Sequence, residues 1–175
     1  AQDGEREVSL RRVGDVQALG CVYHMCAGTH DDMAPLQVLA DTLTATKTGR
    51  LYKALVEPGL ATSVAASAAQ LAEPGYFEVM VEARMEQSLD KIREVLFGVL
   101  DGLGAQTFTE EEVDRAKKSY ARGFDLMLND STRIALRLTE SAATGDWRLM
   151  FLHRDRMGAV KPADVQRVAA AYVKP

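Results

Sequence analysis

Three histidines and two cysteines are the side chains in this sequence of the types that most often bind zinc. A zinc peptidase places two histidines on one helix face beside a glutamate, in the spacing His-Glu-x-x-His or His-x-x-Glu-His. None of the three histidines, His24, His30 and His153, belongs to either pattern. The sequence therefore excludes both zinc peptidase motifs within the chain, and we predict no catalytic and no metal-binding residue.

One loose cluster of metal-binding residue types lies near the start of the chain. It consists of Cys21, His24, Cys26 and His30, and its spacing matches no standard zinc module. On a strand, Cys21 would face the side opposite to His24 and Cys26. We therefore expect ordinary packing and a loop histidine here, and no disulfide between the two cysteines.

A nucleophilic or nucleotide-binding site has little support. The sequence contains no Gly-x-Ser-x-Gly, no Gly-x-Gly-x-x-Gly and no phosphate-loop lysine motif. Cys26 with His24 or His153 could in principle form a nucleophile and base, but small buried cysteines are usually inert. We predict no cofactor-binding residue in this chain.

Arg50 and Tyr52 combine a basic and an aromatic side chain at the start of an expected helix. One interpretation is contact with an extended peptide or a neighbouring domain. The other, which we favour, is that Leu51 and Leu55 pack inward while Arg50 and Tyr52 lie at the rim of the core. The acidic run at residues 110–112 is best explained as helix capping and a solvated surface, not as paired catalytic carboxylates.

The elements that would position these residues follow from hydrophobic periodicity. Alternating apolar residues predict strands at residues 6–13 and 76–85, and we also expect strands at 17–26, as a central strand, and at 60–69. Periodic apolar stripes and stop signals predict helices at residues 33–43 and 49–56. Either Asp31 or Asp32 can cap the first of these helices.

The second half of the chain is expected to be helical. Residues 88–103 carry an amphipathic stripe, and Thr109 to Glu112 form a capping box that opens the next helix. Asp130 caps a helix that ends at Gly145, and Pro162 opens the last one. The order predicts an α+β fold with one mainly antiparallel sheet and helices packed on one face.

Size and charge narrow the function classes. A chain of 175 residues suits one domain, residues 1–175. The net charge of -4 and the lack of a basic stripe disfavour nucleic acid as a partner. No apolar run is long enough to span a membrane. Because the sequence does not begin with Met, we expect a segment of a longer multi-domain chain, and its compartment, bacterial periplasm or cytoplasm, stays open.

Several motifs, in this order, carry a family resemblance over nearly the whole chain. The segment LRRVGDVQ at residues 10–17, Tyr23-His24 and AGTHD at 27–31 resemble the opening of the non-zinc domain of insulinase/pitrilysin-type metallopeptidases. The later motifs that agree are GRLYKALVE at 49–57, EPGYF at 73–77, TEEEV at 109–113 and GDWR at 145–148.

The resemblance implies a metallohydrolase-like, non-catalytic domain of a peptide-hydrolysing zinc enzyme. In this family, α+β domains pair into two halves that close like a clamshell around a peptide, and a different domain carries the zinc. It implies zinc for the parent protein only, and as partners a preceding zinc-type domain, the other half of the clamshell and a peptide substrate. An excised domain of this kind is also expected to self-associate weakly.

Two details of the resemblance bear on function. Some family domains carry an arginine and a tyrosine after the 49–57 helix that hold the substrate, whereas Val56 and Thr62 stand at the matching positions here. This difference favours a supporting role. The alternative reading is a scaffold domain of an inactive family member or core-type subunit, and a His-x-x-Glu-His motif upstream of this segment would separate the two.

Overall fold

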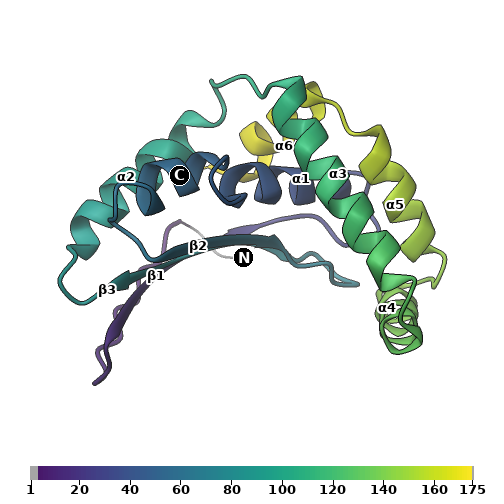
Figure 1. The fold of residues 1–175 in the computed structure, drawn as a ribbon, viewed down its shortest axis with the longest axis horizontal. Helices are drawn as coiled ribbons and strands as arrows, with labels where there is room; N and C mark the ends of the chain where they lie inside the picture. Colours follow the sequence, from purple (N-terminus) through teal and green to yellow (C-terminus); the bar gives the residue numbers. More distant parts are fainter. Residues whose placement is uncertain (1–3, 175) are drawn as a thin grey trace.

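The computed structural model describes residues 4–174, in which three antiparallel strands form one sheet. The strands are β1 (Val16–His24), β2 (Ser63–Ala68) and β3 (Tyr76–Arg84), in the order β1-β3-β2. In the register, Leu19 of β1 and Val64 of β2 both lie opposite Val81 of β3. Figure 1 shows the sheet as a curved layer with the helices on its convex side.

Strict alternation along β3 gives the sheet one buried face. Phe77, Val79, Val81 and Ala83 are at most 1% exposed, while Tyr76, Met80 and Arg84 point to the other side and are exposed. This confirms the half-buried strand predicted from the sequence. Since β3 pairs with both neighbours, it is the central strand.

Two strand predictions are wrong. Residues 5–12 adopt no regular secondary structure, although a strand was expected at 6–13, and Val8 and Leu10 are 89% and 74% exposed. The alternating pattern is present, but the segment pairs with nothing that could bury it. Without it, β1 is an edge strand among the described residues, and not the central strand expected at residues 17–26.

One layer of helices covers the buried face of the sheet (Figure 1). It contains α1 (Met33–Thr44), α2 (Leu89–Gly102), α3 (Glu110–Met127), α5 (Leu149–Ala159) and α6 (Pro162–Tyr172). α1 is the central element of this layer, and Leu36, Val38, Leu39 and Leu43 on it are completely buried. The α+β fold with helices on one face of an antiparallel sheet is thereby confirmed.

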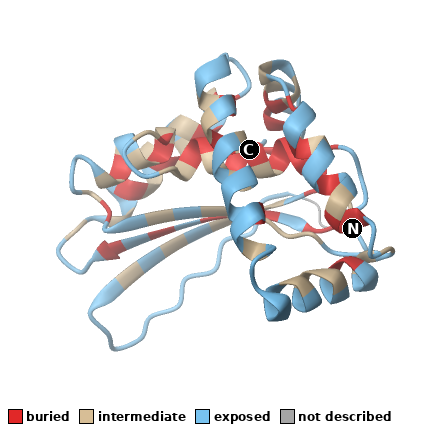
Figure 2. Cartoon of the chain, turned by 45° about the vertical axis from the view of Figure 1, so that its right-hand side comes forward, coloured by how far each residue is buried: buried red, intermediate tan, exposed pale blue. Residues whose placement is uncertain are grey.

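Two elements depart from this regular layer. The helix that begins at residue 50 continues as a π-helix, η1 (Tyr52–Val56), before the turn at residues 57–59. α4 (Ser131–Thr144) projects from the end of the layer, and Ser141 is its only buried residue. Figure 2 shows the buried residues concentrated between the sheet and the other helices.

The expected helix caps are present with one exception. Thr109 and Glu112 form the predicted capping box, and Asp130 Oδ1 accepts from the backbone N–H of Thr132 and Arg133. Asp32 occupies the N-cap position of α1 but makes no side-chain cap. Its carboxylate instead accepts hydrogen bonds from residues of α6. No helix among the described residues is long and apolar enough to span a membrane.

Candidate functional site

One face of the sheet is covered by no helix of the layer, and we call it the outer face. Its apolar part is formed by small residues, valines, one tyrosine and one methionine: Val16, Ala18, Gly20, Val22, Ala65, Tyr76 and Met80. Met80 lies over Gly20, because a Cβ at residue 20 would come within 2.6 Å of the Met80 sulfur. Glycine at this position therefore keeps the outer face flat.

Charged residues interrupt these apolar residues on the central strand β3. Glu78, Glu82 and Arg84 lie on the outer face, and Ser63 Oγ donates to Glu82 Oε2 at 3.0 Å. A surface of mixed apolar and charged side chains can contact a polypeptide or another domain. It offers no nucleophile and no general base.

The free peptide groups of the sheet lie at its two edges. β1 and β2 each pair only with β3 among the described residues, so each leaves one edge open. A strand at a sheet edge can accept an additional strand through main-chain hydrogen bonds. β3 itself offers no edge, because both of its sides are already paired.

The histidines and cysteines do not form a metal centre. His153 is buried with Nε2 against Gln37 Oε1 at 2.8 Å, and the exposed His30 accepts through Nδ1 from the backbone N–H of Asp32. Across residues 4–174, no three His, Cys, Asp or Glu side chains gather so that they could hold a metal ion. These residues therefore do not fit the zinc that the family resemblance implies for the parent protein.

The two thiols are poor nucleophiles in this fold. Burial raises the pKa of Cys21 on β1 to about 11 and also raises the pKa of Cys26. Both therefore stay protonated at neutral pH, and both are free. Burial, with the charges of Arg137 and Arg156, lowers the pKa of His153 to about 4, so its imidazole is neutral and enclosed.

Arg50 uses its guanidinium to join two distant parts of the domain. It donates to both carboxylate oxygens of Glu112 at 2.9 and 3.0 Å, to Gln106 and to the carbonyl of Thr107. The guanidinium also lies 4.1 Å from the centre of the Phe108 ring. The Arg50 guanidinium, together with capping hydrogen bonds from Thr109, holds the pKa of Glu112 down at about 2.

Tyr52 lies two residues further on, in the π-helix η1. It is half-buried beside the exposed Lys53, while Leu51 and Leu55 are completely buried. A π-helix of this kind often marks a functional position in a helix. Of the two residues singled out in the sequence, Tyr52 has the side chain with fewer contacts inside the domain.

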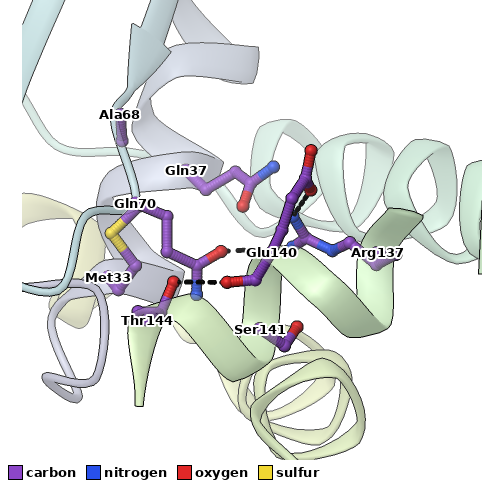
Figure 3. Close-up of a pocket in the computed structure, with 8 residues that line it drawn as sticks. All are labelled: Met33, Gln37, Ala68, Gln70, Arg137, Glu140, Ser141 and Thr144. Atoms are coloured by element: carbon purple, nitrogen blue, oxygen red, sulfur yellow. Dashed lines mark hydrogen bonds and ion pairs between the residues drawn. The ribbon is translucent and has the colours of Figure 1, made fainter. Parts of the chain in front are cut away.

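A polar pocket that the sequence did not predict lies at the end of β2 (Figure 3). It has a volume of about 370 Å³ and is lined by residues of α1, α4 and the stretch after β2: Met33, Gln37, Ala68, Gln70, Arg137, Glu140, Ser141 and Thr144. Arg137 donates to Gln70 at 3.2 Å and to Glu140 at 3.4 Å. The lining offers hydrogen-bond donors and acceptors, and suits binding more than catalysis.

No local spacing could have revealed this pocket, because its walls come from three segments more than thirty residues apart. The outer face, by contrast, was visible in the alternation of residues 76–85. Taken together, the antiparallel sheet, the helix layer on one of its faces and the uncovered outer face define an α+β domain with one open sheet face.

Comparison with known proteins identifies the family. Residues 1–120 match the family described as the peptidase M16 inactive domain. The chain belongs to this family and is a non-catalytic domain of the metallopeptidase type, which confirms the insulinase-type resemblance seen in the sequence. No curated protein matches the chain.

Two solved bacterial structures are similar over most of their length. A Bordetella pertussis protein named as a candidate zinc protease is 33% identical, with 92% of this chain and 89% of that chain covered and a TM-score of 0.84. The inactive peptidase domain of a candidate zinc protease from Bordetella parapertussis is 35% identical, with 95% and 89% covered and the same TM-score.

A Helicobacter pylori protease shares the fold at 21% identity and a TM-score of 0.84. The match covers 92% of this chain but 39% of that chain. There, the fold is one part of a longer polypeptide.

Proposed function

We propose that this domain forms a wall of the substrate chamber of a zinc metallopeptidase and contributes no catalytic group. The observation that carries the proposal is the outer face, where apolar and charged side chains are left uncovered, whereas on the opposite face the β3 residues Phe77, Val79, Val81 and Ala83 are buried under the helices. Zinc and the catalytic glutamate are supplied by a preceding zinc-type domain. The other half of a clamshell completes the enclosure around a peptide.

A surface of this kind can contribute to peptide hydrolysis by enclosing the peptide, without supplying a catalytic group. A chamber wall excludes bulk water and limits the size and conformation of the peptide that reaches the metal. The free edges of β1 and β2 add main-chain donors and acceptors for an extended peptide, and Tyr52 on η1 adds a half-buried aromatic contact. Support comes from the Helicobacter pylori protease, in which this fold occupies part of a longer chain.

The proposal is tested first on the chain by itself. We expect no stoichiometric zinc after dialysis and no cleavage of a fluorogenic peptide, because the ligand set is missing from the described residues. One tightly held zinc ion together with chelator-sensitive cleavage would contradict the proposal.

Peptide contact is tested by following backbone amide signals in NMR during titration with an unstructured apolar peptide. We expect shifts at β1, β2 and the outer face. Ala65→Glu places a charge on the outer face at the middle of the edge strand β2 and should weaken the shifts there, whereas Ala121→Glu on the exposed surface of α3 should not. No shifts at millimolar peptide, or equal effects of both variants, would argue against the chamber-wall role and favour a scaffold domain.

A further inference from the structure

Residues 5–12, which we call the strap, have no regular secondary structure and are exposed, but they are fixed at one end. They precede β1 and are held by Arg93 of α2, whose guanidinium donates to Glu7 at 2.7 Å and to Glu5 at 3.3 Å. Figure 2 shows the exposed chain before β1 as a long loop at the margin of the sheet. The strap is the segment whose alternation predicted a strand that the structure does not contain.

The contacts of Glu5 and Glu7 are those that a strand beside β1 would make. Glu5 and Glu7 contact α2, on the side of the sheet where the helices lie. In an extended chain, alternate residues face opposite sides, so Val8 and Leu10 belong to the other side, that of the outer face. Both are largely exposed.

The connection to β1 sets the register that the strap would adopt. Residues 13–15 form bends between the strap and β1, which starts at Val16. A three-residue hairpin loop pairs residue 12 with 16, and therefore Leu10 with Ala18, Val8 with Gly20 and Glu7 with Cys21. The same register brings Glu5 opposite Tyr23, and the charge of Glu5 is indeed among the influences that raise the pKa of Tyr23.

The edge of β1 offers matching hydrogen-bond groups. The N–H of Met25 donates to the carbonyl of Gly75, in register with the pairing of β1 and β3. Because hydrogen-bonded residues alternate in an antiparallel ladder, odd-numbered residues of β1 bond to β3. The peptide groups of Ala18, Gly20 and Val22 are therefore directed to the open edge, opposite residues 10, 8 and 6 of the strap.

We propose that the strap closes onto β1 as a fourth strand and so controls access to this edge of the sheet. Closure keeps Glu5 and Glu7 beside Arg93 and adds Val8 and Leu10 to the outer face, next to Gly20 and Ala18. The open strap leaves the β1 edge free for another extended chain, and the closed strap blocks it. The inference depends on strand register alone and not on the proposed function.

The register can be tested with the native thiol of Cys21. In the proposed pairing, residue 7 forms a non-hydrogen-bonded pair with Cys21, the type of pair whose side chains approach most closely. We expect Glu7→Cys, in a Cys26→Ser background, to form a disulfide with Cys21 under oxidised glutathione at least tenfold faster than either of two control variants. Ser9→Cys faces the same side but lies opposite Leu19, and Val8→Cys faces the opposite side.

Equal rates in the three variants, or no disulfide in Glu7→Cys, would overturn the proposal. Since Glu7→Cys removes one contact with Arg93, hydrogen exchange on the unchanged protein supplies an independent measurement. Closure predicts slowed exchange at the amides of residues 8, 10, 18 and 20. Exchange at the rate of an unstructured peptide at all four amides would also overturn the inference, even if the variant forms the disulfide.

Discussion

His153 on α5 is a neutral imidazole enclosed between helices, and this makes the fold sensitive to acid. Its side chain packs edge-on against the Tyr120 ring, and its pKa is lowered from 6.5 to about 4 by burial and by the charges of Arg137 and Arg156. As the pH falls, the unfolded chain takes up a proton before the folded chain does. From pH 7 to 4.5, His153 should therefore reduce the free energy of unfolding by about 2 kcal/mol.

Asp41, in the last turn of α1, has the opposite effect. Burial alone raises the pKa of its carboxyl from 3.8 to about 6. Here the folded chain takes up the proton first, so acidification below pH 6 stabilises the fold, and this gain is lost as the pH rises again. The shift corresponds to about 2 kcal/mol over the same interval, which solvent screening of this partly exposed group reduces to about 1 kcal/mol.

The two groups therefore offset one another in the unchanged protein. We expect a net loss of about 1 kcal/mol between pH 7 and 4.5 from this pair. Asp41→Asn removes the compensating group, and its loss should grow to about 2 kcal/mol. His153→Gln removes the acid-sensitive group, and the fold should instead gain about 1 kcal/mol over the same interval.

Urea denaturation at pH 7, 6, 5 and 4.5, followed by circular dichroism, measures these differences. The interval stops at pH 4.5 because below it the unfolded chain protonates Glu112 and Asp32 before the folded chain, in which their pKa values are lowered, and these carboxylates then add their own loss of stability. Parallel pH profiles for the unchanged protein and Asp41→Asn would refute the reasoning. So would an unchanged acid loss in His153→Gln, because the sensitivity would then belong to another group.

Two further predictions concern single side chains. Arg50→Gln leaves Glu112 without its bidentate partner in a site where both side chains are about 15% exposed. The free energy of unfolding, measured by urea denaturation, should fall by about 2 kcal/mol. Arg115→Gln removes the partner of Glu111 in an exposed pair and should lower it far less. Gly98 lies on the exposed side of α2, where an added Cβ meets nothing within 4 Å. Gly98→Ala should therefore increase the free energy of unfolding by about 0.5–1 kcal/mol and raise the melting temperature. Gly75→Ala should lower the melting temperature, because its Cβ would collide with the backbone carbonyl of Ala69.

Much of the fold was predictable because its elements are consistent with their local sequence. The alternation in residues 76–85 fixed the buried side of β3, and Thr109 and Asp130 began helices where their capping side chains predicted. These features depend on neighbours within four residues. They can therefore be read without knowing the rest of the structure.

Features that depend on distant partners could not be read in this way. Glu112 was recognised as a cap, but its second role as the partner of Arg50 joins residues 62 positions apart. Asp32 was expected as a cap, and instead it accepts hydrogen bonds from Arg167 at 2.6 Å and from Tyr172 at 2.9 Å. In both cases, a charged partner from another helix determines where the carboxylate points.

Val56 and Thr62 show how the structure bears on the choice between holding a substrate and supporting the fold. Both the N–H and the hydroxyl of Thr62 donate to the carbonyl of Glu82, at 2.7 and 3.0 Å, and so join the start of β2 to β3. Val56 is half-buried and packs against the core at the end of η1. The positions where the family resemblance places a substrate-holding arginine and tyrosine are thus occupied by a residue that packs against the core, Val56, and one that joins two strands, Thr62. If the domain holds a peptide, as we propose, the open strand edges offer main-chain hydrogen-bond groups that recognise backbone shape more than side-chain identity.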